Sequence, residues 1–570
     1  MNGGGDGQAQ SPTGEVHEAR AVNPPLARLR QAVAEHREFL LILGLFLAFR
    51  LMFVLVVRPG GYLGVMTTFH YYHLLQSLAN QGYIPLVDYW VEYPPLMPWL
   101  LWGIYRLSLL IPPWIEAGTW YLTLLGATFA LFEAGNLVLF YGIGRRLHSQ
   151  AEAVRRAWIY TALFIPVVTL LSTFDNVVLF FLLWIVLLTL DRRAAGAGVV
   201  AGLGFMAKLV PVVALPAAWL HMPAWSRRAR LVAAFALVVM LIALPFLLAG
   251  PEHFLAAFTT VVDRGSWETV WALLDGYYSF GVAGGPDRFN PADAGAAQHP
   301  SALPALPIAV AFGLLYLWLL TRHAEWQERR VAVAFVALSQ NLLLLYSRGY
   351  SPQFLVMVLP FVLLLLPAWR GVLYALLLSA ASLVEYPLYF VVLPDEPWLL
   401  AGAVLLRTLL LIILSLEFAA QVYAWRVAQR RWRQVAAVTL ALSLVLAVAG
   451  GVAGFRAYWQ ARYEASPHHA AMETLAASAA PEASVVVDEQ EVYEQLYPYL
   501  HRRFEVRSVE THDYLPAWEP RLEEAAGEAG ELWLYARAGS PLYAWLAAHR
   551  SLLSEHEFDG WVLSAWEGGG

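Results

Sequence analysis

Long apolar runs set the pattern of this chain. Between residues 39 and 457 they alternate with short polar loops, and each run approaches the roughly 20 residues that a membrane-spanning helix needs. The pattern predicts a mainly α, polytopic helical membrane protein with about 11–13 spans over residues 39–457. Residues 1–38, rich in Gly, Ala and Arg, are expected to form a disordered cytoplasmic tail. The apolar segment at 39–58 that follows is too long for a signal peptide and lacks its cleavage site.

The pattern changes after residue 457. Glu, His and Ser become frequent, and apolar residues alternate with period two at 484–487 and 531–535, which predicts strands. Helical patterns occur at 491–500 and 541–549. Residues 458–570 are therefore expected to form a small α/β domain outside the membrane.

Arginine clusters predict the orientation of the spans, because basic residues are retained on the cytoplasmic side. The clusters lie at 20–37, 145–156, 192–193, 227–230, 322–330, 370 and 426–433. Placing all of them inside puts the N-terminus in the cytoplasm and the C-terminal domain on the extracytoplasmic side. This orientation also requires that segments 94–112 and 118–143 together cross the membrane only once in net terms.

Composition narrows the class of protein. With 59% hydrophobic and 14% charged residues, an ordinary soluble protein is excluded, and the net charge of -6 gives no indication of a nucleic-acid partner. The chain contains neither Cys nor an Asn-x-Ser/Thr acceptor, which suits a bacterial plasma membrane and excludes thiolate metal sites. A Gly-x-Gly-x-x-Ala string at 196–201 falls inside an apolar segment, so it predicts close helix packing rather than dinucleotide binding.

Charged side chains in or beside apolar segments are the candidates for function, because a charge is costly there. On the predicted outer side they are Asp88, Glu92, Asp175, Lys208, Arg264, Glu268, Arg348 and Glu385. On a helix, the spacing of Asp88 and Glu92 would place both carboxylates on one face. Lys208 is the single lysine of the chain and stands where two short apolar helices are expected to meet. Such a set suits sugar transfer from a lipid phosphate, with a carboxylate as base and cations on the leaving phosphate.

Each candidate also has a purely structural interpretation. Asp88 and Glu92 could form a solvated loop face, and Asp175 could cap the helix that follows it. Lys208 and Arg348 could be interfacial anchors that extend toward the lipid headgroups.

The remaining polar groups allow similar alternatives. Arg264 and Glu268 could form a surface pair at i,i+4 spacing. His70 and His73 could ligate a metal together with Asp88 or Glu92, although loop histidines are more often solvated or packed. No cofactor is certain, and participation of a divalent cation stays open.

Five short sequence strings occur along the chain in an order that matches a known protein family. They are YIPLVDYWVEYPP at 83–95, FD at 174–175, GLGFMAKLVP at 202–211, RGSWE at 264–268 and YSPQF at 350–354. In this combination the chain resembles GT-C glycosyltransferases, particularly the bacterial proteins similar to glycosyltransferase family 87, the polyprenyl-phosphate-mannose-dependent mannosyltransferases. The likeness covers most of the membrane portion, to about residue 400.

The resemblance implies an inverting transferase that moves a sugar, mannose first among the candidates, from a polyprenyl-phosphate donor to an extracytoplasmic glycan or glycolipid acceptor. Asp88 would be the base, with Glu92 orienting it or the acceptor. Cations would receive the donor phosphate, namely Lys208, Arg264 and Arg348. Contacts to the sugar or the acceptor are assigned to Asp175, Glu268, Glu385, His70 and Tyr93.

One departure from the family pattern affects this assignment. The family usually places a catalytic Asp early in the first outer loop, a few residues before a Tyr, and here the stretch at 67–72 reads TTFHYY, with Thr68 in place of an acid. Either Asp88 or Glu92 serves as the base, or the alignment is shifted, or the activity has been lost.

Two other classes remain as alternatives. A lipid or solute transporter would often show inverted repeats and charges near the bilayer midplane. No repeat is visible here and the polar residues gather on one predicted face, which favours an enzyme. A catalytically inactive GT-C-like scaffold is the other alternative.

Overall fold

The structure is a computed structural model. It describes residues 31–56, 75–76, 78–112, 118–169, 173–263, 265–279, 281, 287–295, 301–423, 426–481, 483–509, 518–528 and 530–568. The chain divides into two units, the membrane unit Met1–Ala449 and the C-terminal unit Gly450–Gly570. The division falls within a long helix, a few residues before the change of composition at 458.

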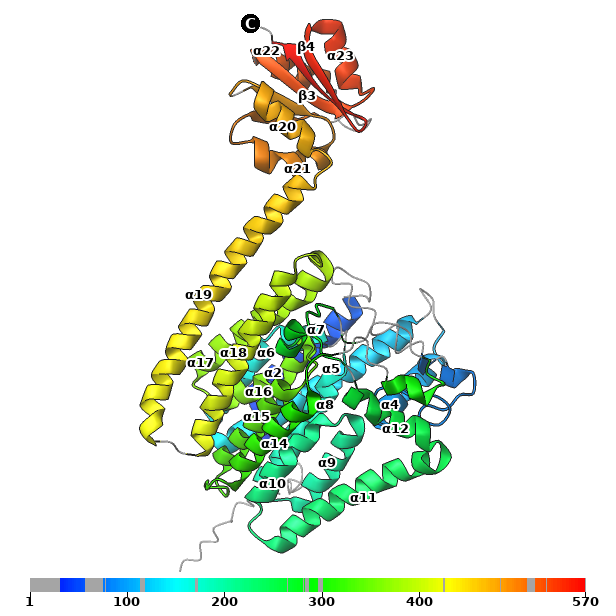
Figure 1. Ribbon diagram of the computed structural model, residues 1–570, viewed down its shortest axis with the longest axis vertical. Coiled ribbons are helices and arrows are strands. Elements are labelled where there is room, and N and C mark those ends of the chain that lie inside the picture. Colours follow the sequence, from blue (N-terminus) through cyan, green and yellow to red (C-terminus); the bar gives the residue numbers. More distant parts are fainter. Residues whose placement is uncertain are drawn as a thin grey trace, which may run out of the picture. The chain divides into compact units, whose positions relative to one another are not determined.

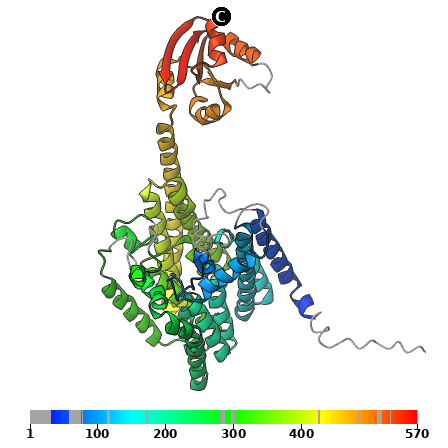
Figure 2. The same ribbon diagram turned by 90° about the vertical axis from the view of Figure 1, so that its right-hand side faces the viewer.

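The named elements of the membrane unit are all helices, joined by turns and loops (Figures 1 and 2). In its first half it contains α2 (Arg37–Val56), α4 (Leu96–Ser108), α5 (Thr119–Leu147), α6 (Gln150–Thr161), α7 (Ile165–Thr169), α8 (Asp175–Leu190), α9 (Ala194–Ala207), η1 (Val210–Ala214), α10 (Leu215–His221) and α11 (Trp225–Ala249). It continues with α12 (Pro251–Asp263), α13 (Val270–Leu274), η2 (Pro291–Gly295), α14 (Ala305–Thr321), α15 (Arg329–Tyr346), η3 (Pro352–Met357), α16 (Leu359–Leu365), α17 (Ala368–Leu383), η4 (Val384–Val392), α18 (Pro397–Val422) and α19 (Arg426–Glu464), which runs on into the C-terminal unit.

Seven helical segments in the described part of the chain are long and apolar enough to cross a membrane, and five shorter apolar helices accompany them. The predicted polytopic helical membrane protein is therefore confirmed. The expected 11–13 spans correspond to a mixture of full-length and short helices, because several runs are broken by turns. The run at 368–392, for example, is kinked at Tyr386 and Pro387.

Helix α8 occupies the interior of the membrane unit. Its sequence after Asp175 and Asn176 is apolar on every side, which is typical of a helix that is surrounded by others. It packs against α5, α9 and α15, and most of its side chains are buried. The position of Asp175 at its first residue therefore places a carboxylate at the end of a central helix.

The glycine string at 196–201 confirms its packing interpretation. Gly198 and Gly202 of α9 lie against α11, and a Cβ atom at Gly202 would be 2.8 Å from that of Val238. A Cβ atom at Gly198 would overlap the carbonyl oxygen of Leu231. The two helices approach this closely only because both positions lack a side chain.

The C-terminal unit contains a sheet and helices, as the predicted α/β fold requires, and the helices cover both faces of the sheet. Its strands are β1 (Ser484–Val487), β2 (Glu505–Ser508), β3 (Glu531–Arg537), β4 (Leu552–Phe558) and β5 (Trp561–Glu567), in the order β2-β1-β3-β5-β4. Strand β1 pairs in parallel with β2 and β3, and β5 pairs antiparallel with β3 and β4. The helices are α20 (His469–Ser478), α21 (Gln490–Leu500), α22 (Glu519–Glu528) and α23 (Pro541–His549).

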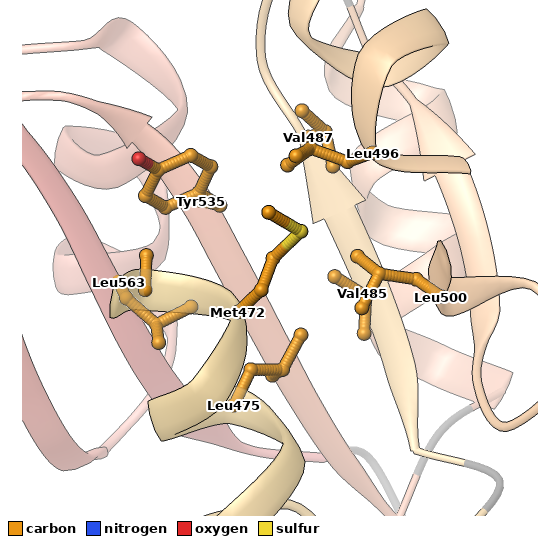
Figure 3. Close-up of a pocket in the computed structure, with 9 residues that line it drawn as sticks. Met472, Leu475, Val485, Val487, Leu496, Leu500, Tyr535 and Leu563 are labelled. Atoms are coloured by element: carbon orange, nitrogen blue, oxygen red, sulfur yellow. The ribbon is translucent and has the colours of Figure 1, made fainter. Parts of the chain in front are cut away.

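Apolar cores fill both faces of this sheet. Helices α20 and α21 cover one core, and α22 and α23 cover the other. The first core contains a cavity of about 10 Å³, and Figure 3 shows apolar side chains such as Met472 and Leu563 pointing into it. A space of this size, with almost no polar lining, is a packing gap rather than a ligand site.

Candidate functional site

An ion pair between two helix ends forms the centre of the candidate site. Lys208 directly follows α9, and its ammonium lies 2.7 Å from the carboxylate of Asp175, the first residue of α8. The side chains are 17% and 2% exposed, respectively. Phe174 holds the N-cap position of α8, so Asp175 serves the ion pair and not as the cap. Lys208 is engaged by this carboxylate, which favours a role within the site over that of a headgroup anchor.

Aromatic rings surround the Lys208 ammonium. Its Nζ atom lies 4.5 Å from the ring centroid of Phe354 and 5.3 Å from that of Phe174, distances at which a cation is attracted by the ring face. Tyr93 meets Phe174 edge-on at 4.5 Å between centroids, and Tyr350 meets Phe354 at 5.6 Å. The loop at 83–95, α8, the end of α9 and the 350–354 string thus converge on one place.

A second charged cluster lies beside these rings. Arg407 of α18 donates hydrogen bonds to the carboxylate of Glu385 and to the backbone carbonyl of Glu268. All three residues are buried, and the Arg407 guanidinium lies 3.6 Å from the ring centroid of Tyr350. Burial and the neighbouring Glu385 carboxylate raise the pKa of Glu268 well above its ordinary value. The Arg407 guanidinium therefore holds the Glu385 carboxylate and the Glu268 backbone, and the two carboxyl groups lie beside each other.

Backbone pairing holds the segment of Glu268 in place. The N–H of Trp267 donates to the carbonyl of Arg348 at 3.1 Å, and the N–H of Tyr350 donates to the carbonyl of Trp267 at 3.1 Å. Thr269 adds a hydroxyl bond of 2.8 Å to the Arg348 carbonyl. Gly349 is required between these residues, because a Cβ atom there would overlap the Trp267 ring. The surface-pair interpretation of Glu268 is wrong, since its side chain is buried.

The loop that carries Asp88 and Glu92 is a set of turns and not a helix, so the expectation that both carboxylates share a helix face is wrong. Pro85 and the Pro94-Pro95 pair explain this, because proline disfavours a helical conformation in the residue before it. The carboxylate of Asp88 accepts the N–H of Ile84 at 2.7 Å and closes the turn.

Glu92, later in the same loop, is held by an ion pair with a distant part of the chain. Its carboxylate is buried and lies 3.2 Å from the guanidinium of Arg288, which in turn stacks over Trp90 with its central carbon 4.1 Å from the ring centroid. Within the described residues, no hydrogen bond or ion pair joins Asp88 to Lys208. The link between this loop and the ion pair runs through Tyr93 and Phe174.

Residues 90–347 match the family model of glycosyltransferase family 87. The chain is a glycosyltransferase. The matched range begins after Asp88 and ends before the YSPQF string at 350–354, so it is narrower than the resemblance seen in the motifs. It contains Asp175, Lys208 and Glu268, whereas Glu385 lies beyond it.

Other comparisons add the following findings. Among solved structures, the glycosyltransferase is similar to ArnT from Cupriavidus metallidurans, crystallised with undecaprenyl phosphate, at 15% identity and a TM-score of 0.37, with 91% of this chain and 97% of that chain covered. No curated protein sequence matches it significantly.

The glycosyltransferase brings five of the predicted site residues into two adjoining clusters, which are Tyr93, Asp175, Lys208, Glu268 and Glu385. Arg348 contributes its backbone to the same region, and Asp88 and Glu92 lie on the loop that Tyr93 connects to it. Arg264 and His70 lie outside the described residues, as does His73, the other histidine of the metal alternative.

Arg407 and Asn136 are the residues that sequence reasoning missed. Arg407 lies inside an apolar stretch of α18, and an arginine there is itself a signal of function. Asn136 of α5 donates to the carbonyl of Asn176 at 2.9 Å and thus fixes the first turn of α8 next to Asp175. One turn away on α5, Glu133 pairs with Arg50 at 3.4 Å, with both side chains fully buried.

Proposed function

We propose that the glycosyltransferase moves a sugar, mannose first among the candidates, from a polyprenyl-phosphate donor to a hydroxyl group of an extracytoplasmic glycan or glycolipid. The observation that carries this proposal is the Asp175–Lys208 ion pair among aromatic rings, inside the range that matches family 87. An ammonium fixed by a buried carboxylate is a prepared site for a phosphate group, and the rings offer apolar faces to a sugar or a prenyl chain.

Lys208 would stabilise the leaving phosphate. Asp175 accepts one of the three N–H groups of the ammonium, which leaves the others for phosphate oxygens. As the bond between the anomeric carbon and the phosphate oxygen breaks, the electron pair stays on the phosphate and its negative charge grows. A cation at a fixed position lowers the energy of that transition state. Arg264 and Arg348 are proposed as further phosphate contacts.

Asp88 would act as the base. The Ile84 N–H fixes one carboxylate oxygen of Asp88. The other carboxylate oxygen is proposed to take the proton of the acceptor hydroxyl while the hydroxyl oxygen bonds to the anomeric carbon. Attack opposite to the leaving phosphate inverts the configuration. The Glu92–Arg288 pair would keep this loop in position, and Glu268 and Glu385 would receive sugar hydroxyls.

The arginine distribution supports the sidedness of this proposal. With the arginine clusters in the cytoplasm, the N-terminus lies inside, and the site and the C-terminal unit lie on the extracytoplasmic side of what we propose is a bacterial plasma membrane.

Transfer of radiolabelled sugar from a polyprenyl-phosphate donor, measured in membranes that contain the protein, tests the proposal. We expect Lys208→Ala to lower the rate by about 100-fold or more, because one electrostatic contact to the transition state is lost. Asp88→Asn should be affected about as strongly. Asp395→Asn, on an exposed loop, is the matched control and should keep full activity.

Two outcomes would contradict the assignment. Full activity in both Lys208→Ala and Asp88→Asn would remove these residues from the site. Accumulation of a solute in proteoliposomes without any covalent product would favour a transporter instead.

A further inference from the structure

The end of α19 has the composition of a membrane interface. The candidate span runs over Ala437–Glu464, and Phe455 near its end has a side chain that is 63% exposed. The turns that follow carry Arg456, Tyr458, Trp459, Arg462 and Tyr463. Aromatic and basic side chains at the end of a span mark the depth of the lipid headgroups.

Helix α21 of the C-terminal unit packs directly on these turns, as Figure 1 shows. The hydroxyl of Tyr499 donates to the carbonyl of Trp459 at 3.4 Å. The Tyr499 ring also lies 4.4 Å from that of Tyr463 and 5.9 Å from that of Trp459, between centroids. Placing the end of α19 at headgroup depth therefore also places the C-terminal end of α21 at that depth.

Acidic and basic residues lie at opposite ends of α21. Glu491 and Glu494 lie in its first turns, whereas Arg502 and Arg503 follow its last residue and are exposed. On α19, Arg462 donates to the hydroxyl of Tyr458 at 3.1 Å and is the neighbour of Tyr463, whose ring packs on that of Tyr499. The basic end of α21 is therefore the end that meets α19.

An aromatic face accompanies these cations. The rings of Tyr493 and Tyr497 lie 5.3 Å apart, and Tyr497 stacks on His501 at 4.9 Å. Tyr497 is 40% exposed, while Leu496 and Leu500 of the same helix enter the core of the sheet. Tyrosine rings with exposed polar tips suit the boundary between lipid and water.

We propose that Trp459, Arg462, Tyr497, Arg502 and Arg503 form an anchor surface that binds the headgroups of an anionic lipid bilayer. The arginines pair with lipid phosphates, and the rings enter the interface at the level where α19 leaves the hydrocarbon. The anchor surface directly follows the candidate span of α19, and the basic end of α21 is the end beside it. Both features favour a lipid surface over a protein partner. The anchor surface holds the C-terminal unit against the membrane from which α19 emerges.

Depth-dependent quenching in the full-length chain tests this proposal. The chain has no cysteine, so a single His501→Cys substitution can carry a fluorophore without further changes. Ala547→Cys, exposed on α23 at the opposite face of the sheet, is the matched control. In nanodiscs of phosphatidylcholine with phosphatidylglycerol, we expect a lipid-borne headgroup quencher to act on residue 501 and aqueous iodide to act on residue 547.

Charge substitutions test the role of the arginines. Replacement of Arg502 and Arg503 by Ala should lower the ratio of lipid-contacting to water-exposed label at residue 501 by about tenfold or more, because each cation near an anionic surface contributes independently. Replacement of both by Lys should preserve the ratio, which separates loss of charge from misfolding. Arg521→Ala, exposed on α22, should have no effect.

Several results would overturn the proposal. Labels at 501 and 547 that respond equally to iodide would show that α21 faces water. An equal ratio in nanodiscs of pure phosphatidylcholine would remove the requirement for anionic lipid. Shielding of residue 501 from both quenchers would indicate a protein partner at this surface.

Discussion

Buried charges in this protein are matched one to one over long sequence distances. Lys208 pairs with Asp175, Glu92 with Arg288, and Glu385 with Arg407, which also donates to the backbone carbonyl of Glu268. A buried charge without its partner is strongly unfavourable, because water no longer solvates it. The individual residue is thus the scale at which the site is most sensitive to substitution.

Arg407→Ala is expected to destabilise the protein by about 3–5 kcal/mol, because it leaves the Glu385 carboxylate buried without a cation. Replacing Arg407 by Met and Glu385 by Leu together should restore most of that stability. Thermal unfolding of the detergent-solubilised chain measures both effects. The exposed Arg322→Ala should change stability by no more than about 0.5 kcal/mol. Equal losses in the single and double variants would contradict the pairing.

His468 makes the C-terminal unit sensitive to acid. Burial lowers the pKa of His468, whose Nδ1 lies 2.7 Å from the Tyr535 hydroxyl. The unfolded chain therefore binds a proton at a higher pH than the folded one, so stability is lost as pH falls below the ordinary histidine pKa of about 6.5. The urea midpoint of the unit should fall over this range in the wild type and fall less in His468→Gln. Identical slopes would contradict the assignment.

At the scale of elements, the site is built from helix ends. Asp175 begins α8, Lys208 follows α9, and Glu385 is the second residue of η4, directly before the kink at Tyr386. The ends of short helices leave polar backbone groups and side chains accessible inside the bundle. A continuous spanning helix would keep its backbone groups in its own hydrogen bonds. The breaks that lower the number of full-length spans are thus the same features that position the polar groups.

Gly198→Ala is expected to push α9 away from α11 and to destabilise the protein by about 1–3 kcal/mol, because the added methyl group overlaps the Leu231 carbonyl. Gly196→Ala is the matched control on the same helix, since its Cβ atom would lie 3.6 Å from Leu188, an ordinary contact. Chemical denaturation of the two variants in detergent measures the difference. Similar stability of both would show that α9 can shift without loss.

The elements could be predicted from the sequence far better than their contacts. Hydrophobic periodicity located the spans and the strands of the C-terminal unit, because each pattern is local. The Asp175–Lys208 pair joins residues on two helices, and no spacing rule links them. The helical interpretation of Asp88 and Glu92 is wrong because prolines on either side of them disfavour a helix. Arg407 was overlooked although an arginine inside an apolar helix is costly.

At the scale of the whole molecule, two units have separate cores. The sheet of the C-terminal unit is covered by helices on both faces, and its edge strand β4 exposes Glu555, His556 and Glu557. Charged residues on an edge strand prevent pairing with other sheets. The unit therefore has the features of an independently folding domain.

Residues 458–570 expressed alone are expected to fold into a soluble domain with a single cooperative urea transition. Circular dichroism and dispersed amide resonances in an NMR spectrum check this. Truncation to residues 484–570 removes α20 and one side of the first core, and it should abolish the transition. A gradual transition in the longer fragment would show that the membrane unit is needed for folding.

The Asp175–Lys208 contact has a practical consequence for chemistry on this protein. Lys208 carries the only side-chain primary amine of the chain, so a reagent selective for amines reports on one internal position. Its side chain is 17% exposed and engaged by a carboxylate, and acylation there requires the contact to open. The fraction of the Lys208 peptide that is acylated, measured by mass spectrometry, then reports how often the contact opens. A lower fraction in the presence of an added lipid phosphate would show that the phosphate shields the amine.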